Sequence, residues 1–462
     1  MRDLFQISDT RFWEGQSMNK YVKRLGAVTL AAGMLCGMVC SASAGNFAAK
    51  IGSTGYATLS EAMEKVQNGQ TIVVQSNITN ETAGNLAGVQ LYYDGAAAKS
   101  FAIDFNGHSL TENRSGDPVQ ALALCAGEKA GQVSITLKNG KISAGGENVC
   151  GIYIGDDNTS SPMTVTLQNM TVQAKGDAGI LCSGAKLISQ ANVSGVDDAV
   201  FAEDSTIELV AGTYTAAGQD SDDGVIAAYR TTGEDSAELD FSLVRTPEAP
   251  AIVRPADWTS LRTMSLTVIH FADVKPSWYY DYVYGAAQKG IVSGVGNVWT
   301  FLPNNAVTRE QFAVILANTA GADLSRYKNI SQFRDVPAGK WSAAGIEWAR
   351  ANGVLSGKGN GIFAPADSIT RQEACVMLYQ FQTNVLKLEP RKLVEVPAFA
   401  DRSEVSSWAE TAVQVMLEEG IMSGNKETKT SPVMIMPKGT TSRAQTCVLV
   451  TKLLALSESR AQ

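Results

Sequence analysis

The sequence of 462 residues is short of histidine, of charged residues and of any basic excess. It contains 2 histidines, and 38 lysines and arginines face 46 aspartates and glutamates, for a formal net charge of -8. A chain without a basic excess cannot neutralise many phosphates, which excludes nucleic acid as a general partner. The hydrophobic fraction of 45% and charged fraction of 18% are typical of a folded, soluble, multidomain protein. Any anion site must therefore be local.

Cysteine is scarce as well. Two of the seven cysteines fall in an N-terminal targeting segment, and five remain: Cys125, Cys150, Cys182, Cys375 and Cys447. An odd and sparse set does not form a disulfide framework, so we expect buried free thiols. The spacing of the first three predicts an internal ladder. No ligand pairs have the short spacing of a zinc site, and we predict neither a metal nor a cofactor.

Long apolar runs are absent after residue 44. Before it, a basic stretch from Met18, an apolar stretch from Leu25 to Val39 and the small residues Ala42-Ser43-Ala44 predict a cleaved signal peptide, with residues 1–17 as an upstream extension. An uncleaved membrane anchor is the alternative, but the apolar stretch is short for a helix that spans a bilayer. We expect a secreted protein with no membrane span after cleavage.

Residues 45–245 have the pattern of an all-β domain. One short helix is expected at residues 56–65, followed by strands that alternate apolar and polar residues at 71–75, 101–105, 133–137, 163–167 and 205–209. Asn-Gly corners such as Asn106-Gly107 and Asn139-Gly140 follow several of them, which favours a solenoid of repeated coils. The segment resembles the right-handed parallel β-helix of pectate-lyase-like surface proteins, with residues 56–65 as its cap. A β-sandwich is the alternative.

Acidic pairs raise the question of catalysis in this segment. They are Asp156-Asp157, Asp197-Asp198 and Asp222-Asp223. Convergent carboxylates could perform acid/base chemistry on a polysaccharide, whereas Asp beside Gly or Asn commonly occupies turns. We favour turns. Neither His108 nor His270 lies in the Gly-His-Gly context expected of a pectin-hydrolysing β-helix. Prolines then mark residues 246–270 as a linker.

The chain after residue 270 repeats three times. Each copy begins with Phe-x-Asp, continues with a Trp that opens a helix, and ends that helix at a Gly followed by Ile or Val and a second Gly. The aspartates are Asp273, Asp335 and Asp401, the tryptophans Trp278, Trp341 and Trp408, the first glycines Gly290, Gly353 and Gly420, and the second glycines Gly294, Gly357 and Gly424. A second helix follows in each copy, so the region predicts an all-α module of helix-loop-helix units.

Each second helix begins with a capping box, in which Thr308, Thr370 and Ser442 are N-caps. Arg309, Arg371 and Arg443 therefore occupy the first helical position, where the helix dipole disfavours a cation. A cation placed there three times predicts an anion held by the arginine fork and the free helix amides. The alternative is an ion pair with the repeated aspartates.

These motifs resemble the S-layer homology (SLH) repeat, with copies at residues 271–325, 333–385 and 399–455. The resemblance implies a pseudo-threefold module whose grooves bind secondary cell-wall polysaccharide, often bearing a pyruvyl ketal. By that analogy the three arginines contact the ligand, the tryptophans offer a flat face to a sugar, and the aspartates and glycine turns shape the groove. The alternative for the tryptophans is a place in the core. The third copy has a longer loop, so its groove is expected to differ.

Two hypotheses follow from the sequence. In the first, the protein is secreted, lies on the bacterial cell wall or S-layer surface and binds wall polysaccharide or peptidoglycan, with possible S-layer neighbours and no catalysis. In the second, the β-helix is a wall-tethered lyase or hydrolase, which requires at least two of the paired aspartates to converge beside a basic residue.

Overall fold

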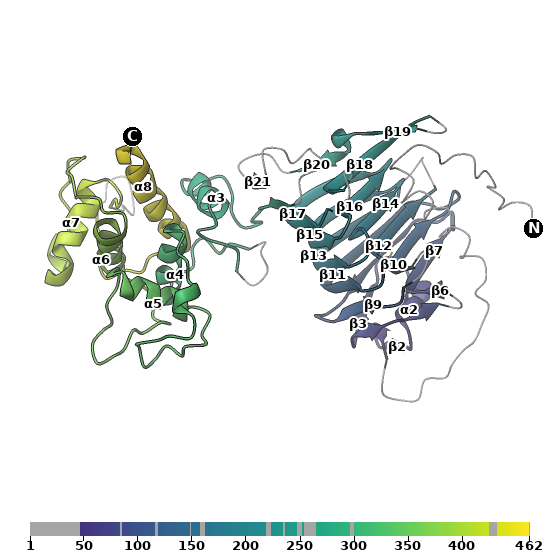
Figure 1. The fold of residues 1–462 in the computed structure, drawn as a ribbon, viewed down its shortest axis with the longest axis horizontal. Coiled ribbons are helices and arrows are strands. Elements are labelled where there is room, and N and C mark those ends of the chain that lie inside the picture. The colour runs from purple at the N-terminus through teal and green to yellow at the C-terminus, as the bar shows by residue number, and fades with distance from the viewer. Residues whose placement is uncertain are drawn as a thin grey trace, which may run out of the picture. The chain divides into compact units, whose positions relative to one another are not determined.

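The computed structural model describes residues 47–461 apart from 84–85, 116–118, 148, 158–161, 219–222, 234–235, 247–251, 254–264, 296–299 and 425–431. The predicted signal peptide and Asp222 lie outside the described residues. The chain divides into two compact units, Met1–His270 and Phe271–Gln462 (Figure 1). Within the described parts of the chain, no helix has the length and hydrophobicity needed to cross a bilayer.

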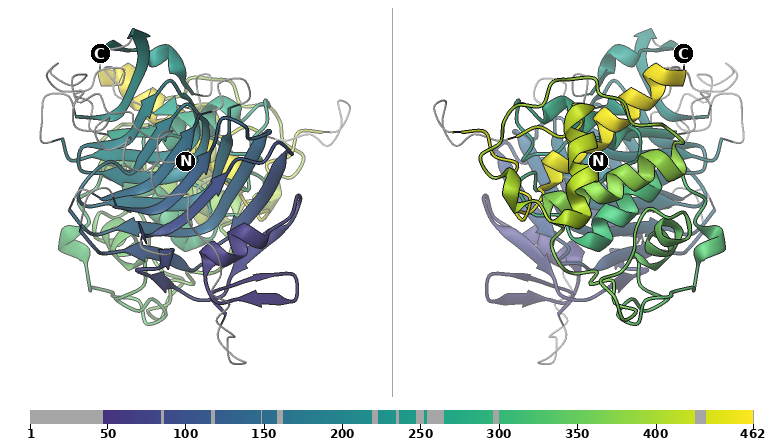
Figure 2. Two further views of the ribbon diagram at one scale, coloured as in Figure 1. Left: turned by 90° about the vertical axis from the view of Figure 1, so that its right-hand side faces the viewer. Right: turned by 90° about the vertical axis from the view of Figure 1, so that its left-hand side faces the viewer.

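Two large sheets build the N-terminal unit (Figure 2, left). The first contains, in spatial order, β2 (Thr54–Tyr56), β1 (Ala49–Ile51), β3 (Thr71–Val74), β8 (Lys99–Asp104), β11 (Val133–Ala144), β13 (Thr164–Ala174), β15 (Lys186–Gly195), β17 (Thr206–Ala216), β22 (Ser265–Val268) and β21 (Ile252–Val253), with β4 (Ile78–Thr79), β9 (Ser109–Glu112) and β20 (Val244–Arg245) beside this path. The second contains β19 (Ser236–Leu239), β18 (Gly224–Gly233), β16 (Asp198–Glu203), β14 (Ile180–Ser183), β12 (Val149–Asp156), β10 (Val119–Ala126) and β7 (Val89–Tyr93). A separate hairpin joins β5 (Thr82–Ala83) to β6 (Leu86–Ala87).

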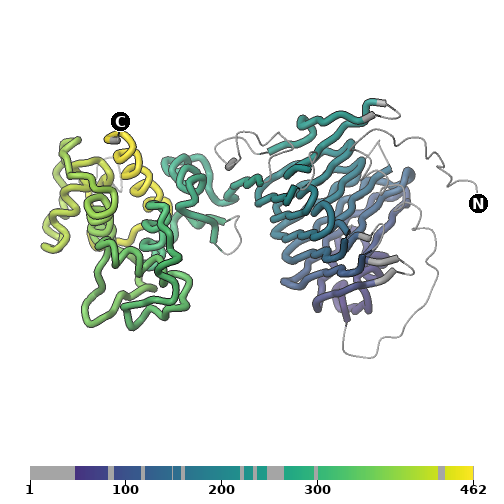
Figure 3. Tube along the Cα trace, in the orientation of Figure 1, coloured from purple at the N-terminus to yellow at the C-terminus, as the bar shows by residue number. Residues whose placement is uncertain are grey.

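From β10 to β18 the chain alternates between the two sheets, and successive strands within each sheet pair in parallel (Figure 3). Alternate side chains of the strands point inward, so Ile135 and Leu137 of β11 share one buried cluster with Ile152 and Ile154 of β12. The region is therefore mostly β with parallel strands. Parallel pairing is incompatible with the antiparallel β-sandwich that the sequence left open.

The predicted asparagine corners adopt left-handed backbone conformations. Asn106, Asn139 and Asn169 have φ of 50°, 58° and 53°, a region that asparagine enters more readily than most residues. The side-chain amide of Asn169 donates to Asn139 Oδ1 at 3.2 Å, and that of Asn139 donates to Asp104 Oδ1 at 3.2 Å. The corners therefore stack from one coil to the next.

The predicted cysteine ladder is wrong. The register pairs Cys125 with Gly155, Cys150 with Gln120, and Cys182 with Ile154. The coils differ in length, so equal spacing along the sequence does not bring the thiols together. All five cysteines of the described chain are free thiols, as expected.

Both ends of the sheets differ from a simple repeat. Helix α2 (Leu59–Lys65) lies within the range predicted for a helix. Its N-cap is Thr58, whose hydroxyl accepts a hydrogen bond from the amide of Glu61. At the other end, β22 pairs antiparallel with both β17 and β21. The residues expected to form a linker therefore include two strands of the first sheet.

Six α-helices organise the described part of the C-terminal unit (Figure 2, right). They are α3 (Tyr280–Gln288), α4 (Arg309–Thr319), α5 (Ala343–Ala351), α6 (Arg371–Gln380), α7 (Glu410–Glu418) and α8 (Arg443–Ala461). The second helix of each repeat packs on the first helix of the next, because α4 contacts α5, α6 contacts α7 and α8 contacts α3. Val283, Ile346 and Val413 occupy the same buried place on the first helices.

Local sequence signals set the helix ends as predicted. Thr308 and Thr370 form complete capping boxes, and Ser442 exchanges the corresponding hydrogen bonds with Gln445. The first helices end where Gly290, Gly353 and Gly420 take φ of 67–69°, which requires a residue without a Cβ. Three isolated β-bridges also join the repeats, so the unit is helical but not purely α-helical.

Candidate functional site

Each repeat uses its aspartate to hold the loop that precedes the second helix. Asp335 accepts hydrogen bonds from the amides of Phe363 at 2.9 Å and Ala364 at 2.7 Å, one on each carboxylate oxygen. Ala364 has a φ of 57°, which costs a residue with a Cβ about 1–2 kcal/mol. Burial raises the pKa of Asp335, but the hydrogen bonds from the two amides outweigh it and lower the pKa below 3.8.

The other two aspartates repeat this arrangement. Asp273 accepts from the amides of Phe301 and Leu302, and Asp401 accepts from those of Ile435 and Met436. Both oxygens of each carboxylate are therefore used inside the protein. The aspartates fix the loop and do not form the ion pairs with the arginines that the sequence left as an alternative.

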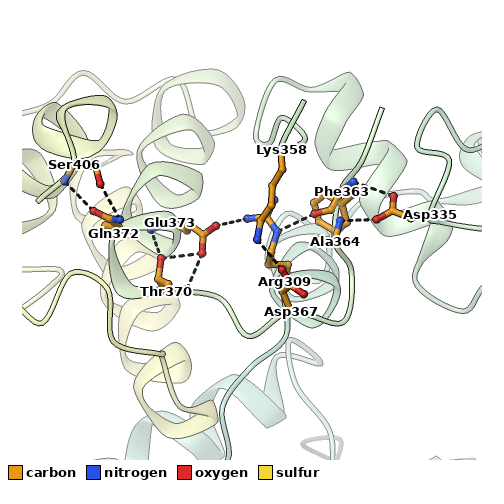
Figure 4. Close-up of polar contacts among 10 residues, drawn as sticks. All are labelled: Arg309, Asp335, Lys358, Phe363, Ala364, Asp367, Thr370, Gln372, Glu373 and Ser406. Atoms are coloured by element: carbon orange, nitrogen blue, oxygen red, sulfur yellow. Dashed lines mark hydrogen bonds and ion pairs between the residues drawn. The ribbon is translucent and has the colours of Figure 1, made fainter. Parts of the chain in front are cut away.

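Each arginine reaches into the loop of the following repeat. Arg309 Nε donates to the carbonyl of Phe363 at 2.9 Å, Arg371 Nε to that of Ile435 at 2.7 Å, and Arg443 Nε to that of Phe301 at 2.7 Å. The accepting carbonyl belongs each time to a loop that an aspartate fixes (Figure 4, for Arg309). Since Arg443 of the third repeat bonds to the first, these contacts form a closed circle.

The helix amides are engaged in the same way. Arg309 and Glu310 donate their amides to the carbonyls of Asp367 and Pro365, at 2.9 and 3.1 Å. The amides of Arg371 and Gln372 donate to Gly439 and Pro437, and those of Arg443 and Ala444 donate to Asn305 and Pro303. The prediction that free helix amides hold an anion is therefore wrong, because the neighbouring repeat takes the first two donors of each helix. Any anion must be bound by side chains.

The tryptophans are on the surface. Trp278, Trp341 and Trp408 expose 63%, 63% and 58% of their area, whereas Trp348 exposes 7%. Three large aromatic faces left in water at equivalent places are not core residues, so the core alternative is wrong for them. They are available for contact with a ligand.

The second glycine of each turn allows close packing. A Cβ on Gly424 would lie 2.3 Å from a ring carbon of Phe399, and one on Gly357 would lie 2.7 Å from a ring carbon of Phe333. No side chain would fit, and Gly294 holds the same position in the first repeat. These glycines shape the turn and provide no ligand atoms of their own beyond the backbone.

A cavity of about 420 Å³ lies beside Arg371. It brings together residues of all three repeats, since Trp278 comes from the first, Arg371 from the second, and the turn 421–424 from the third. Helix α8 completes the wall with Gln445, Val448 and Leu449. The volume is that of a small-molecule site, which typically spans about 300–1,000 Å³. Three predicted site residues, Trp278, Arg371 and Gly424, thus share one cavity.

The charge of Arg371 is only partly compensated. Its Nη2 donates to the carbonyl of Ser423 at 3.0 Å, and the described residues offer it no ion pair within 4.0 Å. Burial lowers the pKa of Arg371, and burial likewise lowers the pKa of Arg443, whose Nη2 donates to the carbonyl of Ser293 at 2.7 Å. Among the described residues, Arg371 is held by backbone carbonyls, whereas the guanidinium of Arg443 also lies over the Phe301 ring, 4.4 Å from its centre.

Arg309 differs from both because it pairs with a carboxylate. It is 5% exposed, its guanidinium lies 4.9 Å from the centre of the Phe363 ring, and its Nη1 lies 2.9 Å from Glu373 Oε1. A carboxylate of the second repeat therefore already occupies the position predicted for an external acid (Figure 4). The assignment of ligand contact to Arg309 is not supported by this geometry.

The acidic pairs of the N-terminal unit do not all converge. Asp156 ends β12 and accepts a hydrogen bond from the amide of Met163, whereas Asp198 begins β16 and accepts from Gly224 at 3.0 Å. The register places these two at opposite ends of their strands, which corresponds to about 20 Å at 3.3 Å per residue. Asp198 is paired with Gly224 on the adjacent strand, so Asp223 lies next to Asp197 and Asp198. Among the described residues, no group of three or more histidines, cysteines or acids could hold a metal.

Comparison with known families decides the identity of the repeats. A family model described as the S-layer homology domain matches residues 270–313, 332–375 and 398–447. The C-terminal unit carries three SLH domains. They coincide with the three units that the motifs defined.

Several known proteins are similar to part of this chain. The endoglucanase of Bacillus sp. (strain KSM-635) is 31% identical over 188 residues, which cover 40% of this chain and 18% of the relative. The cellulosome-anchoring protein of Acetivibrio thermocellus is 28% identical over 156 residues, or 33% of each chain. The surface-layer 125 kDa protein of Lysinibacillus sphaericus is 34% identical over 122 residues, or 25% of this chain and 10% of the relative. The chain spans a third or less of these relatives. The SLH domains and the surface-layer and anchoring relatives indicate a place at the cell surface or cell wall.

Sequence reasoning missed the groups that complete the cavity. Gln445 appeared in the sequence as part of a capping box, and Val448 and Leu449 as apolar helix residues. The sequence shows only that apolar residues recur five and six positions after the arginine of each second helix. The contact of Trp278 with the same cavity depends on the closure of the third repeat onto the first, for which the sequence contains no local signal.

Proposed function

We propose that the SLH domains anchor the protein non-covalently to the cell wall by binding an acidic, pyruvylated secondary wall polysaccharide. The cavity that joins Arg371 to Trp278 carries this proposal. A guanidinium suits a planar carboxylate, and its partly compensated charge favours an anion over a neutral sugar. The exposed indole of Trp278 offers an apolar face to a pyranose ring.

The proposal includes an architecture for each unit. The alternation of parallel strands between two sheets, with stacked asparagine corners, supports a right-handed parallel β-helix capped by α2. The circle of arginine and bridge contacts supports a pseudo-threefold SLH module. The β-helix acts as a surface for binding or structure. Asp156 lies far from Asp198, so a lyase or hydrolase would have to rely on Asp197, Asp198 and Asp223 at the other end of the strands.

Sedimentation with wall sacculi tests the anchor. The full chain should co-sediment with intact sacculi and remain in solution after the secondary polymer is removed. Arg371→Ala and Trp278→Ala should both lose sedimentation, while Arg326→Ala, at an exposed arginine of the same unit, should retain it. Equal sedimentation with stripped sacculi would instead identify peptidoglycan as the ligand and end the acidic-polymer proposal.

A further inference from the structure

The three arginines face different residues at one equivalent position. The third residue of the second helix is Gln311 in the first repeat, Glu373 in the second and Gln445 in the third. Because each arginine reaches toward the following repeat, Arg309 meets Glu373 at 2.9 Å, while Arg371 shares its cavity with the neutral Gln445. At this position the groove between repeats 1 and 2 therefore has a carboxylate, where the groove between repeats 2 and 3 has the neutral amide of Gln445.

Glu373 is held firmly in this position. Its Oε2 accepts hydrogen bonds from the amide and the hydroxyl of Thr370, at 2.9 and 2.8 Å, while Oε1 accepts from Arg309. Moving the carboxylate aside would break the capping box as well as the ion pair. The side chains of Arg309 and Glu373 are 6% and 19% exposed, so water screens the pair little. An external acid would have to displace a partner that the fold fixes.

A second carboxylate lies in the same groove. Asp367, whose carbonyl accepts the amide of Arg309, pairs with Lys358 at 2.7 Å. The equivalent carbonyls come from Gly439 beside Arg371 and from Asn305 beside Arg443, and neither residue is charged. Charge within the first groove is thus balanced internally, whereas Arg371 has only carbonyl partners among the described residues.

We infer that the acidic group of the wall polymer binds at Arg371 in the groove between repeats 2 and 3, and that Glu373 excludes it from the groove between repeats 1 and 2. The inference rests on the proposed function, and makes the residue three positions into the second helix the determinant of acid specificity. Gln445 at that position leaves Arg371 open to its cavity, whereas Glu373 occupies Arg309. Arg443, whose following repeat has Gln311 there, instead packs against the Phe301 ring at 4.4 Å. Both residues complete the capping box, so the exchange changes charge with little change in fold.

Exchange of these two residues tests the inference in the full chain. The probe is a methyl glucoside carrying a 4,6-linked pyruvyl ketal, titrated by calorimetry, with its methyl ester as the uncharged control. Glu373→Gln should raise the number of acid-binding sites by one. Gln445→Glu should weaken binding at the existing site at least tenfold, and the double exchange should restore binding through Arg309. Gln380→Glu adds a carboxylate elsewhere on α6 and should change nothing.

The outcomes separate the two proposals. If Gln445→Glu binds the probe and sediments with sacculi as the wild type does, or if Glu373→Gln gains no site, the inference is overturned while the anchor remains. If the wild type neither binds the probe nor sediments with sacculi, the proposed function itself fails. Thermal unfolding followed by circular dichroism shows whether each variant is folded. If Gln445→Glu does not fold, Gln445→Asp is used in its place and must give the same loss of probe binding.

Discussion

Asp401 should be the most sensitive of the three loop aspartates to replacement. Its side chain is 3% exposed and accepts two amide hydrogen bonds, from Ile435 at 2.8 Å and from Met436 at 2.6 Å. In Asp401→Asn, one oxygen still accepts, but the new amide group faces an N–H donor. Loss of one hydrogen bond to a charged group costs about 1.5–3 kcal/mol. The loop also holds Met436 at an unfavourable φ of 54°, so its backbone should leave this conformation once the hydrogen bonds to Asp401 weaken.

We therefore expect Asp401→Asn to destabilise the C-terminal unit by about 2–3 kcal/mol. Urea unfolding of the full chain, followed by tryptophan fluorescence, measures this, because five of the seven tryptophans lie after residue 270. The control is Asp367→Asn, which removes only an exposed ion pair worth about 0–1 kcal/mol. If the two variants unfold at the same urea concentration, the aspartate does not hold the loop and the role assigned to it is wrong.

Three further predictions follow from burial, packing and titration. Trp278→Ala should abolish wall sedimentation at nearly unchanged stability, whereas Trp348→Ala should destabilise the unit by about 3–5 kcal/mol, as thermal melts would show. Gly424→Ala should cost about 1–3 kcal/mol through overpacking, while Gly285→Ala, in a helix with free space around it, should gain about 0.5–1 kcal/mol in the same urea assay. Asp335 has a lowered pKa in the folded state, so its stabilisation of the fold is complete above the unfolded-state pKa near 3.8. This stabilisation is lost as the pH falls through the folded-state pKa. The difference in unfolding free energy between wild type and Asp335→Asn should therefore shrink below about pH 4.

Features set by neighbouring residues could be predicted from the sequence. The capping boxes at Thr308 and Thr370 involve residues three positions apart, and Gly290 ends its helix through its own backbone conformation. Cys375 and Cys447 are buried, as expected of sparse free thiols. Burial raises the pKa of both thiols to about 12, so they are inert as well as hidden.

Contacts between distant parts of the chain could not be predicted in this way. Arg309 and Glu373 are 64 residues apart, and nothing near either one indicates that they meet. The cysteine ladder failed for a related reason, because the strand register and not the sequence spacing decides which residues stack. The sequence therefore identified Trp278, Arg371 and Gly424 of the candidate site, but neither the residues of α8 that complete the cavity nor which arginine leaves an anion position open.

The hydrogen bond from Arg443 to Phe301 has a consequence for how this protein can change in length. Sheets of parallel strands that pair one after another can lose or gain a strand and still offer a matching edge to the next strand. In the C-terminal unit each repeat bonds to the next and the third bonds to the first, so removing one repeat would leave two unpaired contact surfaces. We therefore expect the N-terminal unit to tolerate changes in length, and the three repeats of the C-terminal unit to be transferable only together.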